Sequence, residues 1–350
     1  MSLEAAFQSH RLIFKFDAGT SRGILKERNT YILKIWDKHY PEHIGRGEAG
    51  PLKGLSPDFY KVEKELAILC EAIKGCRQPE TADELNGLVD KLTAPGLPSI
   101  RFALETALLD LGHGGRQVLF PGDFTEGRGS IPVNGLIWMG DFDFMKDQTD
   151  RKVAEGYSCI KMKIGALNFE QECWLLEYIR KRYGTEIILR VDANGAFSVG
   201  EVNQKLQKLA EYQLHSIEQP IVPGQFGAMA KLCRDPAVPV ALDEELIGIT
   251  ETSQRVALLE QIMPQFLVLK PTLVGGLEAT KQWIRLAEER NIGWWITSTL
   301  ESNIGLNAIA QFTAILAPLV AQGLGTGKLY CNNIPPYNLY QSEGLLNYKP

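Results

Sequence analysis

The sequence lacks the features that mark several classes of protein. No apolar run approaches the ~20 residues that a membrane-spanning helix needs. The N-terminus shows no apolar segment followed by a small-residue cleavage site, so we expect no signal peptide. The formal net charge is only -5 over 350 residues, which argues against nucleic acid as the main partner. The sequence therefore predicts a soluble cytoplasmic protein without membrane or nucleic-acid partners.

Cysteine is scarce and shows no paired motif. The chain has six cysteines, none in a C-x-x-C spacing, and most lie inside apolar helix or strand patterns. They are Cys70, Cys76, Cys159, Cys173, Cys233 and Cys331. This usage favours free thiols in a reducing compartment, in agreement with a cytoplasmic location.

What the sequence does contain is a series of short apolar runs that each end near an ionisable residue. The runs occupy residues 159–165, 187–195, 216–220, 239–244 and 266–271. Their ionisable residues are Lys163, Asp192, Glu218, Asp243 and Lys270. Successive members lie 29, 26, 25 and 27 residues apart. One strand, one helix and two loops need about that length of chain, and parallel strands must be joined by such crossovers.

The repeat predicts an α/β fold of the TIM-barrel type. The apolar run at 294–298 ends 28 residues after Lys270, Gly325 lies 27 further on, and residues 131–136 are the first strand candidate. A βα unit repeated this often closes into a barrel, whose active site lies at the C-terminal strand ends. We expect the barrel to occupy residues 126–327.

The rest of the chain predicts a second unit. Residues 1–125 contain strand patterns near 12–16, 23–25 and 31–36, followed by helical patterns at 57–91 and 100–111. The glycine-rich stretch 43–52 is interpreted as too flexible for a core. We expect an α+β cap over residues 1–125, and we expect residues 328–350 to return to it.

The expected active site gathers acids and lysines. Asp192, Glu218 and Asp243 end three consecutive strands, and such a cluster of carboxylates is costly unless a cation lies among them. Oxygen ligands of this kind suit Mg²⁺, with Mn²⁺ as an alternative. Lys163 and Lys270 end strands on opposite sides of the ring, so a bound substrate would meet an amine on each face.

This combination suits removal of a proton next to a carboxylate in a small molecule. The resulting enolate must be stabilised electrostatically, which a divalent metal can do. A lysine acts as a base only when neutral, and burial and a neighbouring cation favour the neutral amine. Lys161 points to the same strand face as Lys163 because strand side chains alternate, and we expect it to be that cation.

At these residues the chain resembles the enolase superfamily, in its muconate-lactonising subgroup. The resemblance covers nearly the whole chain and implies a cap and a modified (β/α)7β barrel completed by the C-terminal tail. It implies three metal ligands, Asp192, Glu218 and Asp243. It implies two acid/base lysines, Lys163 and Lys270, and three supporting residues, Lys161, Asn194 and Glu244. Superfamily members use a lysine or histidine base with Mg²⁺ stabilising an enediolate.

Within the subgroup, residues 20–23, 133–138 and 298–303 resemble the family of o-succinylbenzoate synthases. That resemblance implies dehydration of 2-succinyl-6-hydroxy-2,4-cyclohexadiene-1-carboxylate to 2-succinylbenzoate in menaquinone biosynthesis. Lys163 would act as base and then acid, and Lys270 would stay protonated. The candidate substrate contacts are Arg22, Ser298, Thr299 and Gly325, and Arg46 is a further candidate for an anion.

Other functions stay open. N-succinylamino acid racemases and dipeptide epimerases use the same two lysines. Epimerases of this subgroup usually carry an Asp-x-Asp after the eighth strand, whereas residues 323–327 contain no acid, which counts against a cationic substrate. A barrel that only binds its ligand would be expected to lack one of the five ionisable residues, and none is lacking. A homo-oligomer is possible.

Overall fold

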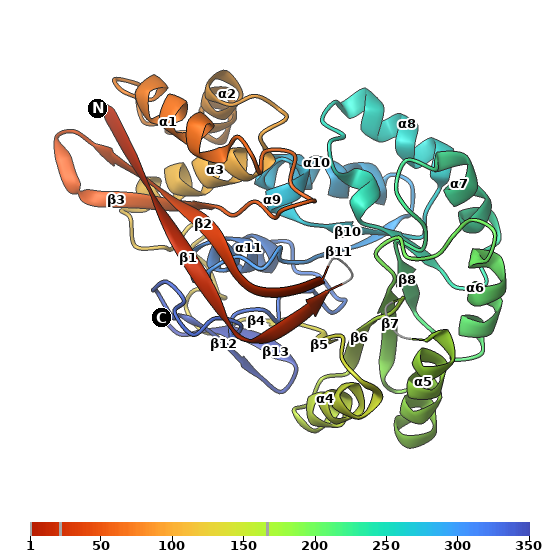
Figure 1. Ribbon diagram of the computed structural model, residues 1–350. Helices are drawn as coiled ribbons and strands as arrows, with labels where there is room; N and C mark the ends of the chain where they lie inside the picture. Colours follow the sequence, from red (N-terminus) through yellow and green to blue (C-terminus); the bar gives the residue numbers. More distant parts are fainter. Residues whose placement is uncertain (1, 21–22, 166–167) are drawn as a thin grey trace.

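The computed structural model describes residues 2–20, 23–165 and 168–350 and contains a cap beside a parallel barrel (Figure 1). The cap begins with an antiparallel sheet of β1 (Leu3–Thr20), β2 (Gly23–Asp37) and β3 (Tyr40–Ala49), in that order. In β2, Leu33 and Ile35 are fully buried against the cap helices, as alternation along a strand requires. The predicted antiparallel strands are therefore present, but β1 begins about nine residues earlier than expected, and the patterns at 23–25 and 31–36 belong to one strand, β2.

Three helices cover this sheet. They are α1 (Val62–Ala72), α2 (Ala82–Leu92) and α3 (Pro98–Gly112). The prediction that residues 43–52 are too flexible for a core was wrong, because β3 packs directly on α3. A Cβ added at Gly47 would lie 1.9 Å from the carbonyl oxygen of Ala103. Glycine is needed at this position for the close approach of strand and helix.

The barrel confirms the predicted fold class. Its seven parallel strands lie in one sheet in the order β11-β10-β9-β8-β7-β6-β5. These strands are β5 (Gly135–Ile137), β6 (Cys159–Lys163), β7 (Ile188–Asp192), β8 (Ser216–Glu218), β9 (Val240–Leu242), β10 (Phe266–Leu269) and β11 (Gly293–Ile296). The connecting helices are α4 (Phe142–Ala154), α5 (Phe169–Tyr183), α6 (Val202–Ala210), α7 (Phe226–Arg234), α8 (Thr252–Ile262), α10 (Leu277–Glu288) and α11 (Asn303–Ile315). Two short helical turns, η1 (Glu244–Leu246) and α9 (Pro271–Val274), follow β9 and β10.

The ring closes through two residues instead of a full eighth strand. Gln322 forms a parallel bridge with Val133, and Gly323 forms one with Thr297 after β11. The strand predicted over 131–136 is divided, because β4 (Ser130–Pro132) ends before β5 begins. Residues 322 and 323 therefore occupy the eighth position and bring residues 323–326 to the barrel mouth.

The C-terminal tail contacts both units. Tyr330 bridges to Phe14 of β1 in the cap. The hairpin of β12 (Leu339–Ser342) and β13 (Leu345–Tyr348) then pairs with β4 ahead of the barrel.

In the part of the chain described above, no helix is both long and apolar enough to cross a membrane. All six cysteine thiols are free.

Candidate active site

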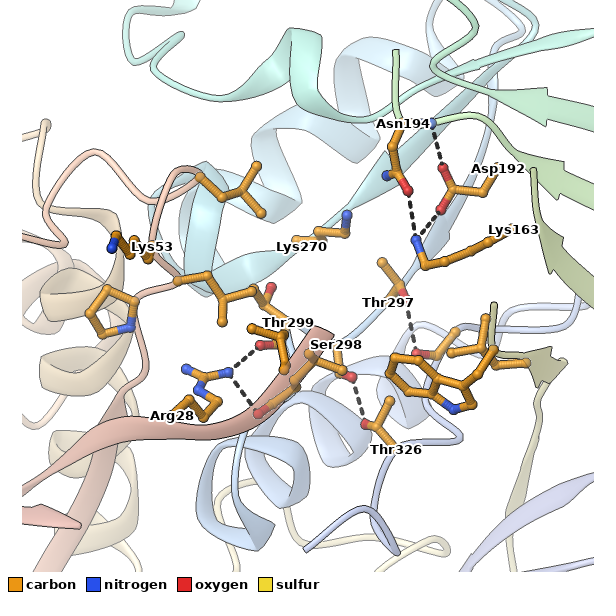
Figure 2. A pocket seen from close by; sticks show the side chains of 18 of the residues that line it. Arg28, Lys53, Lys163, Asp192, Asn194, Lys270, Thr297, Ser298, Thr299 and Thr326 are labelled. Atoms are coloured by element: carbon orange, nitrogen blue, oxygen red, sulfur yellow. Dashed lines mark hydrogen bonds and ion pairs between the residues drawn. The ribbon is translucent and has the colours of Figure 1, made fainter. Parts of the chain in front are cut away.

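A cavity of about 470 Å³ lies at the C-terminal ends of the barrel strands, where the cap meets the barrel. Figure 2 shows lysines, Asp192 and hydroxyl side chains around it. The barrel contributes strand-end residues, and the cap contributes residues of β2 and of the loop at 51–55. The cavity therefore lies where the repeat of strand-end charges predicted an active site.

Three neighbouring strands set the central charges side by side. In the parallel register, Lys163 of β6 pairs with Asp192 of β7, and Asp192 pairs with Glu218 of β8. The Nζ of Lys163 lies 3.0 Å from Asp192 Oδ2, and the Nζ of Lys161 lies 3.1 Å from the same oxygen. Lys161 Nζ also donates to Glu218 Oε2 at 2.5 Å. As predicted, both lysines of β6 point to the same face.

The remaining predicted residues extend this group. Lys270, at the end of β10, forms an ion pair with Asp243 Oδ2. Asn194 Oδ1 accepts a hydrogen bond from Lys163 Nζ at 2.7 Å, and its Nδ2 donates to Glu244 Oε1 at 3.0 Å. Asn194 has a positive φ of 44°, which Asn tolerates better than most residues. The structure therefore brings all eight predicted catalytic, ligand and supporting residues to the barrel mouth.

The electrostatics of the group follow from burial and from charge balance. Burial would raise the pKa of Asp192, but the ammonium groups of Lys161 and Lys163 hold that pKa far below its ordinary value. Burial would lower the pKa of Lys161, but Asp192 and Glu218 raise it instead. For Lys270, burial is likewise outweighed by Asp243 and Glu244, so its pKa is raised. In this group four carboxylates share three ammonium groups. The carboxylates are those of Asp192, Glu218, Asp243 and Glu244, and the ammonium groups are those of Lys161, Lys163 and Lys270.

The unequal number of charges falls on Glu218, whose ionised form is disfavoured. Burial and the neighbouring Asp192 carboxylate raise its pKa well above the ordinary value. Its Oε1 is buried and has no hydrogen-bond partner among the described residues. A buried oxygen in this state is costly unless a proton or a cation meets it. The chemistry of this donor set therefore fits a hard divalent cation.

The present side-chain arrangement places lysines where a cation would bind. Over residues 2–20, 23–165 and 168–350, no three acidic, histidine or cysteine side chains are grouped as a metal site. Lys161 bridges Asp192 and Glu218, and Lys270 contacts Asp243. A metal ion would replace some of these ion pairs.

The predicted substrate contacts line the cavity where the structure describes them. Ser298 and Thr299 follow β11, and Gly325 follows the eighth position. Ser298 Oγ lies 2.6 Å from Thr326 Oγ1, and Thr272 Oγ1 donates to Thr299 Oγ1 at 2.9 Å. These contacts fix two of the hydroxyl groups that face the cavity.

The arginine predictions had a different outcome. Arg22 lies outside the described residues. Arg46 does not belong to the described lining of the cavity, and its Nη1 donates to Gly115 O at 3.5 Å.

Sequence reasoning missed Arg28, which lines the cavity and donates from Nη1 to Thr299 O at 2.5 Å. Lys53 of the cap loop was also missed (Figure 2). Neither residue lies in a repeated pattern, so only the docking of the cap reveals them.

Comparison with known proteins decides the family. Residues 144–336 match the family described as enolase C-terminal domain-like. The chain is 45% identical to a protein named o-succinylbenzoate synthase from Desulfotalea psychrophila, over 98% of both chains. The chain belongs to the enolase C-terminal domain-like family. The resemblance to the enolase superfamily is thereby confirmed.

Two solved structures share the whole architecture. The crystal structure of MenC from Desulfotalea psychrophila LSv54 superposes with a TM-score of 0.89 and 43% identity, covering 99% of this chain and all of the other. A dipeptide epimerase from Enterococcus faecalis V583, complexed with Mg and the dipeptide L-Leu-L-Tyr, gives a TM-score of 0.83 at 18% identity, covering 99% and 97%. At 18% identity, the similarity to the dipeptide epimerase shows a shared fold and nothing about the reaction.

The buried ion pairs predict a strong dependence of stability on Lys161. We expect Lys161→Met to lower the free energy of unfolding by about 3 kcal/mol, because it leaves the buried Glu218 without its ion-pair partner and Asp192 with Lys163 alone. The raised pKa of Lys161 means that its contribution is lost as pH rises past the lysine range. The lowered pKa of Asp192 means that its contribution is lost only in acid. The deficit should therefore persist between about pH 4 and pH 10.

Urea unfolding in EDTA across this pH range measures the deficit. Lys208→Met is the matched control, because Lys208 forms an exposed ion pair with Glu211, of which little stability is expected. Equal effects of the two substitutions would contradict the prediction.

Proposed function

We propose that this chain catalyses the o-succinylbenzoate synthase reaction, the dehydration of 2-succinyl-6-hydroxy-2,4-cyclohexadiene-1-carboxylate to 2-succinylbenzoate. The observation that carries the proposal is the pair of lysines, Lys163 and Lys270, that line one cavity together with Asp192. The other two strand-end acids, Glu218 and Asp243, form ion pairs with Lys161 and Lys270 of the same lining. The full-length similarity to a relative of that name supports the choice of reaction.

Lys163 is proposed as the acid/base group. The Lys163 ammonium must first release its proton to solvent. The neutral amine then takes the proton next to the substrate carboxylate, and the electron pair of the C–H bond moves into an enediolate. The resulting ammonium then gives that proton to the departing hydroxyl, the C–O bond breaks, and water leaves as the ring becomes aromatic. One residue can serve both steps because the elimination is syn. The contacts of Lys163 with Asp192 and Asn194 support a fixed position for its Nζ.

Lys270 is proposed to remain an ammonium that stabilises the enediolate from the other face. Its ion pair with Asp243 supports this role. Asp192, Glu218 and Asp243 would hold Mg²⁺, or Mn²⁺, with Asn194 and Glu244 supporting them. The metal, when bound, would stabilise negative charge on the substrate carboxylate.

The cavity wall supports the synthase reaction over dipeptide epimerisation. Gly325 and Thr326 line the cavity after the eighth position, and residues 323–327 contain no acid that could bind an ammonium group. N-succinylamino acid racemisation remains the alternative, since it would use the same two lysines.

The proposed setting is a cytoplasmic enzyme that takes a small-molecule carboxylate and can form a homo-oligomer. We keep the proposed division into a cap at 1–125, a barrel at 126–327 and a tail at 328–350. Cap residues Arg28 and Lys53 in the cavity lining support a role of the first unit in substrate selection.

An ultraviolet assay of the purified protein with Mg²⁺ tests the proposal. Aromatisation of the cyclohexadiene substrate that EDTA abolishes is the expected result, and polarimetry on N-succinyl amino acids and dipeptides runs beside it. Racemisation without aromatisation would move the function to the alternative.

Lys163→Ala should lower kcat of this reaction by on the order of 10³-fold or more, because the general base is removed. The fold should persist, which circular dichroism and a thermal melt check. Lys181→Ala is the control, since Lys181 forms an exposed ion pair on α5. Substantial turnover by Lys163→Ala would exclude Lys163 as the base.

Asp192→Asn should weaken Mg²⁺ binding by at least about tenfold, ~1.4 kcal/mol, because a charged ligand becomes neutral. Isothermal titration calorimetry measures this without reference to turnover. Asp150→Asn is the control, since Asp150 accepts hydrogen bonds from Tyr178 and Tyr183 between α4 and α5. Unchanged affinity in Asp192→Asn would refute the ligand assignment.

A further inference from the structure

A buried carboxylate of the cap reaches the segment that follows Lys270. Glu105 lies in the middle of α3 and is 2% exposed. Its Oε2 accepts a hydrogen bond from Leu277 N at 2.5 Å, and its Oε1 accepts one from Glu278 N at 3.3 Å. These amides begin α10, whose N-cap residue is Gly276 and so has no side chain to accept them. Glu105 therefore caps a barrel helix from the other unit.

The turn before α10 is shaped around this contact. Gly275 and Gly276 have φ values of 110° and 100°, a region that favours glycine. A Cβ added at Gly276 would lie 2.2 Å from Glu105 Oε2. Only a residue without a side chain lets the carboxylate approach the helix this closely.

The same turn is connected directly to Lys270. The amides of Leu273 and Val274 donate to Lys270 O at 2.8 and 3.0 Å, and Gly276 N donates to Pro271 O at 2.8 Å. All four residues of α9 are buried, and α9 packs against α3. Figure 1 shows α9 between α3 and β10. A shift of this turn would therefore move the backbone that carries Lys270.

We propose that Glu105 is a positioning residue for Lys270: from the cap, it anchors the α9–α10 turn and so fixes Lys270 in the cavity. The proposal rests on the role of Lys270 proposed above. Glu105 does not contact the cavity, so it acts through the turn. Through Glu105, the position of Lys270 in the cavity depends on the cap being docked on the barrel.

Neighbouring charges define the conditions of the test. A second cavity of about 330 Å³ adjoins Glu105 between cap and barrel. The charged groups that face Glu105 there are Asp90, Arg101, Glu251, Arg255 and Glu278. Burial raises the pKa of Glu105 to about 7, against the effect of the two amide hydrogen bonds. At pH 8.5 the carboxylate form of Glu105 therefore prevails, and the measurements are made at this pH.

The test compares Glu105→Gln with Asp58→Asn at pH 8.5 in the Mg²⁺-loaded protein. Asp58 is also buried and accepts from Ser99 N at 2.9 Å and Ser99 Oγ at 2.7 Å, but at the start of α3 and wholly inside the cap. Glu105→Gln should lower kcat for the cyclohexadiene substrate about ten- to a hundredfold with KM within about twofold, because a small displacement of a reacting group costs that much. It should also speed hydrogen exchange over residues 270–278. Asp58→Asn should change neither.

Unchanged kcat in Glu105→Gln, or an equal loss in both variants, would overturn the proposal. If Glu105→Gln does not fold, Glu105→Asp, which withdraws the carboxylate by one methylene, is judged by the same criteria. If the wild-type protein does not turn over the substrate, the proposed function fails. Hydrogen exchange then decides the anchoring alone: faster exchange confined to the Glu105 variant supports it, and unchanged exchange overturns it.

Discussion

The parallel register of β6, β7 and β8 places Lys163, Asp192 and Glu218 in one row, and the chemistry at the barrel mouth depends on that row. Two adjacent carboxylates with side chains 2% exposed would repel one another in a medium of low dielectric constant. Lys161 lies between them and compensates this repulsion. A slip of one residue in β6 would turn both lysines to the outer face and leave the acids unpaired. Strand register and charge balance therefore support each other.

The cap covers the site, and it also holds the shape of the barrel loop that follows β11. Glu48 of β3 accepts hydrogen bonds from Ser302 N and Gly305 N at the start of α11. Arg28 of β2 donates to the carbonyl oxygens of Thr299 and Leu300. Leu300 has a φ of 61°, which few non-glycine residues adopt, so the loop needs such contacts to keep its shape. The wall that bears Ser298 and Thr299 is thus a product of both units.

The features that sequence alone could predict are the periodic ones. Even spacing located the barrel strands and the ionisable residues at their ends, because a βα unit has a narrow range of lengths. Contacts between distant segments carry no such period. The packing of Gly47 on α3, the bridging of Gln322 to Val133, and the reach of Arg28 to the loop after β11 depend on docking. Glycine predicts flexibility locally, but here it allows close packing.

The closure of the barrel explains how one fold can serve different substrates. The strand-end acids and lysines are fixed by register, so a change among them would disturb the buried charges. Residues 323–327 carry no charged side chain, and backbone hydrogen bonds of Gln322 and Gly323 with both neighbouring segments hold the eighth position. A Cβ added at Gly325 would lie 3.3 Å from Asn134 O, within the range where a neighbour must yield slightly. An acidic side chain at position 325 would therefore require the backbone at Asn134, just before β5, to yield as well. This contact couples substrate choice to the first and last segments of the ring.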